Sequence, residues 1–147
     1  MRESRSKYIQ HTDEKAHYCA RAGLLLKDEA QEDFQARRIR LLLAASDAGH
    51  GAATYELALS YAMGIDVSED GSRGAFLFKK AADQGYAKAK VSHSVDLFFG
   101  LNGVKRDEET ALELVGQAVV DRVENAEIAL NIFMEYQRIC QTVEDYL

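Results

Sequence analysis

The chain has 147 residues, 47% of them hydrophobic, and a formal net charge of −6 at pH 7. This length and apolar content suit one folded domain with a buried core and argue against a disordered chain. The acidic charge is scattered and leaves no basic stripe, so we expect no nucleic-acid partner. The apolar runs are too short to span a bilayer, so we expect no membrane insertion.

The start of the chain bears on the compartment. Residues 1–7 are charged and contain serine, without the apolar stretch of a secretory signal. We therefore expect a cytoplasmic protein in which residues 1–11 form a flexible tail.

Cys19 and Cys140 lie near opposite ends of what we expect to be a linear stack of helices, beyond the reach of a disulfide. Both thiols are expected to be unpaired.

From residue 12 onward the apolar spacing is helical almost throughout. We expect a divergent helix pair over 12–47, clear pairs over 50–83 and 86–121, and a polar-ended capping helix over 123–145. In the first helix of each pair, three residues four positions apart share one face, which we expect to be the core. These core trios are Ala53, Leu57 and Tyr61; Ala89, His93 and Leu97; and Ala126, Leu130 and Met134.

The expected helix ends carry suitable residues. Asp70 and Asp107 precede the second helices of two pairs and can accept hydrogen bonds from free backbone N–H groups at the N-cap. Four glycines fall where helices end and suit the left-handed conformation of a C-terminal cap. They are Gly49, Gly64, Gly85 and Gly100.

The same segment is written twice in the chain. The residues from Asp47 to Ala53 return from Asp83 to Ala89, 36 positions on, and past Gly100 the offset becomes 37. A fixed period of this size indicates a stacked-repeat protein. Such proteins work mainly through surface area, so the period constrains the shape more than the chemistry.

These residues give the chain its resemblance to the Sel1-like repeat family, which is related to the tetratricopeptide repeats. The pattern A-x-x-x-L-G-x-x-Y-x-x-G, then G-V-x-x-D, then K-A-A-x-x-G is matched by Ala53, Leu57, Tyr61, Gly64, Val67, Asp70, Lys80, Ala81, Ala82 and Gly85. The next unit offers Ala89, Leu97, Gly100, Gly103, Val104, Asp107, Ala111 and Ala118. The chain departs from it at His93, where leucine is usual, and at Arg122, where the closing glycine would stand.

The resemblance implies an all-α, right-handed α-solenoid of about three and a half antiparallel helix pairs, or about seven helices. It also implies a role in holding other proteins and no shared catalytic residues. The penicillin-binding or β-lactamase-like relatives have one disulfide per helix pair, and this chain has no cysteine pair in any repeat.

The residues themselves do not form a familiar catalytic or metal-binding pattern. His11, His17, His50 and His93 form no i, i+4 pair, and His17 and Cys19 would face opposite sides of a helix. The acid pair at 108–109 suits the start of a helix, where it favours the helix dipole. We expect no catalytic, cofactor or metal site. His93 is either a hydrogen-bonded core histidine or a ligand or pH switch.

In tetratricopeptide-like stacks the first helices line a concave groove. The expected groove residues flank the core positions on these helices: Tyr18 and Ala22; Tyr55 and Leu59; Val91, Val95 and Phe98; and Ile128, Ile132 and Glu135. A row of exposed apolar residues suggests an interaction surface. The alternatives are that a tight superhelix buries the row, or that the register is displaced by one residue.

We therefore expect a non-enzymatic scaffold or adaptor that binds a protein or peptide segment in its concave groove. One alternative is an inhibitor or immunity-type protein that occludes a specific toxin or enzyme. Another is a hydrolase related to β-lactams or peptidoglycan, which no histidine or acid spacing favours. A homo-oligomer formed through the concave or terminal faces also remains open.

Overall fold

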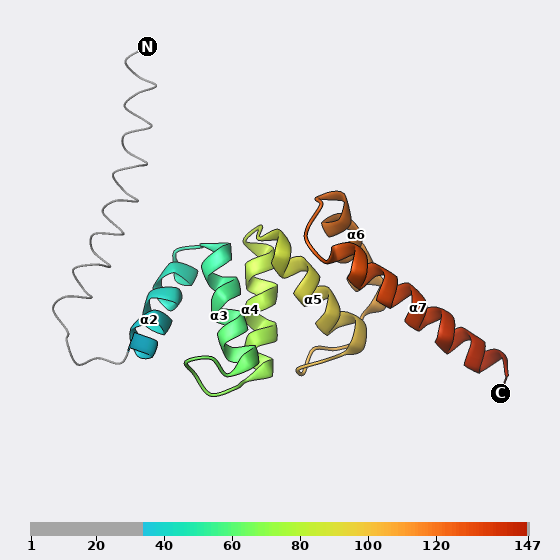
Figure 1. Ribbon diagram of the computed structural model, residues 1–147, viewed down its shortest axis with the longest axis horizontal. Coiled ribbons are helices and arrows are strands. Elements are labelled where there is room, and N and C mark those ends of the chain that lie inside the picture. Colours follow the sequence, from blue (N-terminus) through green and yellow to red (C-terminus); the bar gives the residue numbers. More distant parts are fainter. Residues whose placement is uncertain (1–33, 147) are drawn as a thin grey trace, which may run out of the picture. The chain divides into compact units, whose positions relative to one another are not determined.

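The computed structural model describes residues 34–146, which form an all-α fold (Figure 1). This part of the chain contains six helices and no strand: α2 (Phe34–Asp47), α3 (Gly51–Met63), α4 (Gly71–Asp83), α5 (Ala87–Phe99), α6 (Glu108–Val120) and α7 (Ala126–Asp145). The expected tail at 1–11 and the first helix of the pair at 12–47 lie outside the described residues. So do His11, His17, Tyr18, Cys19 and Ala22.

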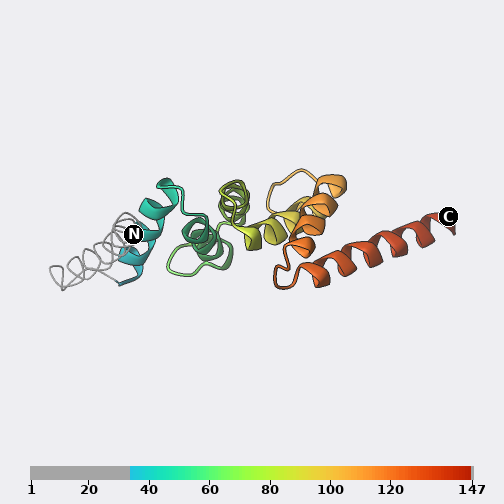
Figure 2. The same ribbon diagram turned by 90° about the horizontal axis from the view of Figure 1, so that it is seen from above.

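Each helix packs against its neighbour in the chain. α3 pairs with α4 and α5 with α6, while α4 against α5 and α6 against α7 join one pair to the next. The helices follow one another in chain order in both views (Figures 1 and 2). α2 joins this stack through Ile39, which lies in one apolar cluster with Leu57 and Tyr61 of α3. The expected all-α stack of helix pairs is therefore confirmed.

The helix ends agree with the residues that stand there. Asp70 accepts a hydrogen bond from the backbone N–H of Arg73 at 3.0 Å, and Asp107 accepts one from that of Thr110 at 3.1 Å. The four expected glycines all have positive φ. These caps satisfy backbone groups that the helices leave free, which confirms the expected ends of the helices.

The turn before α7 differs from the equivalent turns earlier in the chain. Arg122 takes the left-handed conformation, with φ 55°, where Gly49 and Gly85 stand at the equivalent turns. Asn125 then adds a second left-handed residue, with φ 65°, directly before the helix. α7 consequently begins at Ala126, three residues later than the sequence pattern suggested.

The interior consists of two apolar clusters. The first joins α2, α3 and α4 through Ile39, Leu57, Ala58, Tyr61, Leu77 and Phe78. The second joins α5, α6 and α7 through Phe98, Ala111, Val115, Ala129 and Phe133. Each cluster is supplied by more than one helix pair, so burial of apolar surface holds the pairs together.

The prediction of a core position is wrong for one residue. Met134 of α7 is 58% exposed, whereas Phe133 beside it is buried. Its equivalent in α3, Tyr61, lies under the guanidinium of Arg73 from the second helix of the pair, at 4.3 Å from the ring centroid. No second helix follows α7 within the described residues, so nothing there covers Met134.

None of the helices that the structure describes is both long enough and apolar enough to cross a membrane.

Candidate functional site

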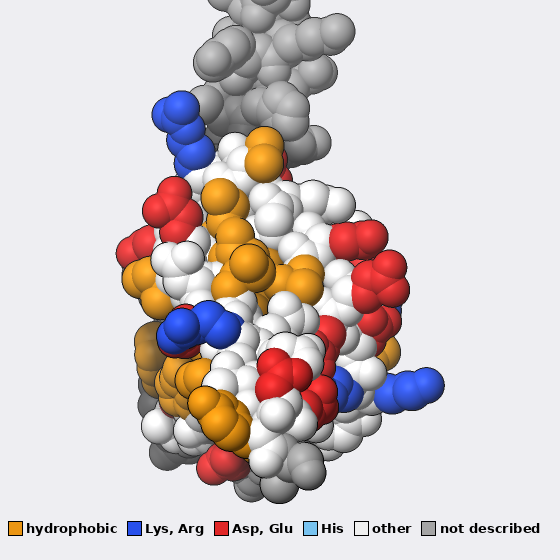
Figure 3. Space-filling model, turned by 90° about the vertical axis from the view of Figure 1, so that its right-hand side faces the viewer, with side chains coloured by type: hydrophobic (Ala, Val, Ile, Leu, Met, Phe, Trp, Pro, Cys, Tyr) orange, Lys and Arg blue, Asp and Glu red, His pale blue; other side chains and the backbone are white. Residues whose placement is uncertain are grey.

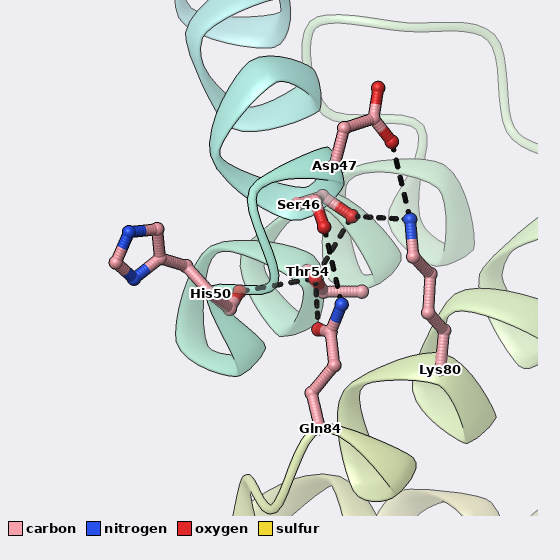
Figure 4. Close-up of polar contacts among 6 residues, drawn as sticks. All are labelled: Ser46, Asp47, His50, Thr54, Lys80 and Gln84. Atoms are coloured by element: carbon pink, nitrogen blue, oxygen red, sulfur yellow. Dashed lines mark hydrogen bonds and ion pairs between the residues drawn. The ribbon is translucent and has the colours of Figure 1, made fainter.

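A polar network connects α2, α3 and α4 (Figure 4). The hydroxyl of Thr54, which is buried, lies 2.6 Å from Gln84 Oε1 and 2.9 Å from the hydroxyl of Ser46. Gln84 Nε2 donates to the backbone oxygen of Ser46, and Lys80 Nζ donates to Ser46 Oγ and Asp47 Oδ1. Because these groups satisfy one another across three helices, the network fixes the position of α2 on the next pair.

The expected groove residues of α3 are only partly accessible. Tyr55 is half-buried, with its ring 5.5 Å from that of Phe78 and 5.1 Å from that of Tyr86. Leu59 is also half-buried and packs against the first apolar cluster. Both side chains therefore contribute to packing as well as to the surface.

The groove residues of α5 fall into two groups. Val91 and Val95 are half-buried against the second apolar cluster. Phe98 is fully buried, contrary to the expectation that it faces the groove. Its ring stacks on that of Phe133 at 4.1 Å between centroids, because α5 packs on α7 as well as on α6. Phe98 is thus a core residue and not a surface residue.

The groove residues of α7 are the most accessible. Ile128 is 59% exposed and Ile132 is 52% exposed, and Ile139 and Val143 continue an exposed apolar row along the helix. Glu135 is exposed and forms an ion pair with Arg138. Figure 3, which faces the C-terminal end of α7, shows hydrophobic side chains gathered among charged ones. α7 therefore presents an uncovered apolar face.

A pocket that the sequence did not indicate lies between α4, α5 and the loop 100–107. Its volume is about 640 Å³. It is lined by Ser72, Ala75, Phe76 and Lys79 of α4, by His93 and Leu97 of α5, and by residues 102–107 of the loop. Three of these side chains are cationic, namely Lys79, Lys105 and Arg106. The pocket thus combines an apolar wall with a basic rim.

His93 forms part of the pocket wall. Only 9% of this residue is exposed, and its Nδ1 is buried without a hydrogen-bond partner among the described residues. Burial lowers the pKa of His93, and the nearby charge of Lys79 lowers it further, whereas Asp83 acts in the opposite direction. The sequence singled out His93 by its departure from leucine, and that was the only signal for this pocket.

The loop that closes the pocket is held by Asn102. Its Nδ2 donates to Asp96 Oδ1 at 2.9 Å, and burial raises the pKa of Asp96. Asn102 also lies directly against Gly71, at a position where any Cβ on residue 71 would collide with its side chain. A glycine at the start of α4 therefore allows the loop from the next repeat to approach.

Other chemical groups are sparse in the described part of the chain. Within residues 34–146 no group of three or more His, Cys, Asp or Glu side chains could hold a metal ion. Cys140 is a free, half-buried thiol. We expected Cys140 to be unpaired, and the structure agrees. Cys19 lies outside the described residues.

The helix pairs and their caps define a helical-repeat protein. The Sel1 repeat family model matches residues 51–86 and 96–119, which cover α3, α4, the last turn of α5 and nearly all of α6. The chain therefore contains Sel1 repeats over these residues, and the resemblance drawn from its motifs is confirmed there. No curated protein and no solved structure matches it.

Proposed function

We propose that the protein is a non-enzymatic adaptor that binds a protein segment along the first helices of its pairs, α3, α5 and α7. Sel1 repeats are generally modules of protein–protein interaction. The family is typically non-enzymatic, so an interaction role is preferred to a hydrolase. The supporting observation is the uncovered apolar face of α7, centred on Ile128 and Ile132.

Equivalent positions on the three helices support a common binding surface. Tyr55, Val91 and Ile128 correspond to one another in the repeat, and so do Leu59, Val95 and Ile132. All six are apolar, and their exposure increases from half-buried on α3 and α5 to exposed on α7. A partner segment with an apolar face of its own would cover this row and remove it from water.

Site-specific photo-cross-linking tests the proposal. A photoreactive residue at position 132 is expected to give a discrete adduct in native extract, and the additional substitution Ile128→Ser is expected to abolish it. The same probe at Glu113, an exposed position on α6, serves as the control. Equal adducts at both positions, or none at 132, would contradict the proposal.

The mass and identity of the adduct separate the remaining alternatives. A mass of two copies of this chain would replace the adaptor with a homo-oligomer. An adduct with one enzyme or toxin, whose activity falls on binding, would identify an inhibitor that uses the same surface.

A further inference from the structure

The pocket between α4, α5 and the loop 100–107 differs in charge from the rest of the chain. The protein as a whole is acidic, with a net charge of −6. The pocket is lined by three cationic side chains and a single acid, Asp107. Asp107 is already engaged, because it caps α6 through the backbone and the hydroxyl of Thr110. The charged side chains that line this hollow are therefore mostly cationic, and two of them pair with acids just outside the lining.

The cations on the rim are available to a ligand. Lys105 lies in no ion pair among residues 34–146, although its charge lowers the pKa of the neighbouring Asp107. Lys79 is paired with Asp83 of its own helix at 2.7 Å, and both side chains are more than half exposed. Arg106 is paired with Glu108, two residues along. The exposed pair of Lys79 with Asp83 contributes little stability, so exchanging Asp83 for a ligand anion costs little.

The wall of the pocket supplies a second, independent observation. His93 is nine-tenths buried in this wall and has an unpartnered Nδ1. The equivalent residues of the other first helices are Leu57 and Leu130. A buried polar group without a partner destabilises a fold, and packing alone is served by leucine at the same position. His93 lines the hollow, while its unpartnered Nδ1 is covered by protein, so its ring acts on a bound anion chiefly through its charge.

The remainder of the lining is apolar. Ala75, Leu97 and Val104 contribute to it, and Phe76 of α4 stands at its edge with 67% of the residue exposed. An exposed aromatic ring beside a hollow can cover an apolar side chain of a ligand. The lining therefore offers an apolar contact next to a site for negative charge.

We propose that this pocket binds an acidic peptide segment in which a carboxylate stands next to an apolar side chain. The carboxylate lies among Lys79, Lys105 and His93, and the apolar side chain packs on Phe76 and Leu97. The proposal rests on the protein-binding role proposed above and names a partner class for it, at a place distinct from the apolar face of α7.

This assignment has a consequence for pH. The charged groups near His93 are Lys79 and Asp83 of α4, Lys105, Arg106 and Asp107 of the loop, and Asp96 of its own helix. In the free protein burial and the charge of Lys79 lower the pKa of His93, which favours the neutral ring. A bound carboxylate raises that pKa, so binding takes up a proton and strengthens as the pH falls.

Fluorescence anisotropy with defined peptides tests the pocket. The probe is a labelled peptide of repeated Leu-Asp and Phe-Glu pairs, and its Asn/Gln counterpart is the neutral control. The acidic peptide is expected to bind at least about tenfold more tightly than the neutral one, a difference of about 1.4 kcal/mol. A phosphoserine peptide tests the other source of an anion. Binding of that peptide alone would overturn the carboxylate assignment, as would equal binding, or no binding, of the acidic and neutral peptides.

Charge-matched variants locate the site. Lys79→Glu with Lys105→Glu is expected to weaken binding of the acidic peptide at least about tenfold. Lys88→Glu with Arg138→Glu changes the net charge equally outside the pocket, and it should weaken binding only about twofold. A similar loss in both double variants would mean that overall charge, and not the pocket, attracts the peptide.

His93→Leu separates a binding role from a structural one. This variant should fold, because leucine occupies the equivalent positions, and its thermal melt checks that it does. Between about pH 7.5 and about pH 5.5, above the ordinary pKa of carboxylates near about 4, affinity should rise in the parent protein and stay flat in the variant. An unchanged pH profile would remove His93 from the site. The cross-link at position 132 tests the proposed adaptor role separately, so either proposal can fail alone.

Discussion

His93 places an imidazole in the interior at a position that leucine fills elsewhere in the repeat. Burial lowers its pKa from the ordinary value of 6.5, so the folded state favours the neutral ring. The unfolded chain therefore binds more protons near pH 6, and stability falls as the pH drops through the folded pKa. Above the pKa of the unfolded chain this pH-dependent loss of stability is absent, although the unpartnered Nδ1 still destabilises the fold.

We predict that His93→Leu stabilises the protein by about 1–3 kcal/mol at pH 7, because it removes a buried polar atom without a partner. The gain should increase at about pH 5, since the parent must then charge or expose the ring. Urea unfolding at the two pH values measures both effects. A loss of stability at pH 7 would mean that the imidazole has a stabilising partner.

Arg122 is a second residue in a conformation that its side chain does not favour. It has φ 55° at the turn after α6, where the equivalent residue in the preceding repeat is Gly85, with φ 85°. We predict that Arg122→Gly stabilises the protein by about 1 kcal/mol and that Gly85→Ala destabilises it by about 1 kcal/mol. Thermal melts of the two single variants compare the turns directly. Destabilisation by Arg122→Gly would instead show that the side chain of Arg122 makes a contact that outweighs the backbone strain.

At the scale of the helix, neighbouring residues of α3 should respond differently to substitution. Leu57 is fully buried in the first apolar cluster, whereas Leu59 is half-buried at its edge. We predict that Leu57→Ala costs about 2–5 kcal/mol by leaving a cavity. Leu59→Ser should cost less and should weaken partner binding. Chemical denaturation and the cross-linking assay measure the two effects, and the reverse order would mean that the faces of α3 are assigned wrongly.

The helices that could be predicted from the sequence are those whose signals are local. The side chains of Asp70 and Asp107 begin α4 and α6, and glycines such as Gly64 end the first helices, because caps depend on residues within one turn. The repeat period of 36 to 37 residues then predicted which helices pair. Local chemistry was sufficient for the architecture.

The predictions that were wrong concern residues whose burial depends on contacts with other helices or loops. Met134 has the spacing of a core residue, but its burial depends on a second helix, and none covers it within residues 34–146. Phe98 was placed on the surface because its stacking partner, Phe133, is 35 positions away. The pocket likewise depends on how the loop 100–107 folds against Gly71. Helical periodicity contains no information about any of these contacts.

At the scale of the whole molecule, stability is shared between neighbours in the stack. In a repeat protein each helix pair contacts only the pairs beside it, so the loss of one contact should lower the stability of the adjacent helices most. The polar network around Thr54 connects α2 to α3 and α4 through hydrogen bonds to Ser46 and Gln84. At the next junction the positions equivalent to Thr54 and Gln84 carry an ion pair instead, Lys90 with Asp121 at 3.5 Å. The two junctions should therefore depend on different interactions.

We predict that Thr54→Val destabilises the protein by about 1–3 kcal/mol, because it keeps the side-chain shape but leaves Gln84 Oε1 without its donor. Hydrogen exchange should accelerate in α2 and at the start of α3, while amides in α6 and α7 stay close to their parent rates. Thr110→Val is the control, because that hydroxyl is exposed and contacts only Asp107. Uniform acceleration across all the helices would instead show that the stack opens as a single cooperative unit.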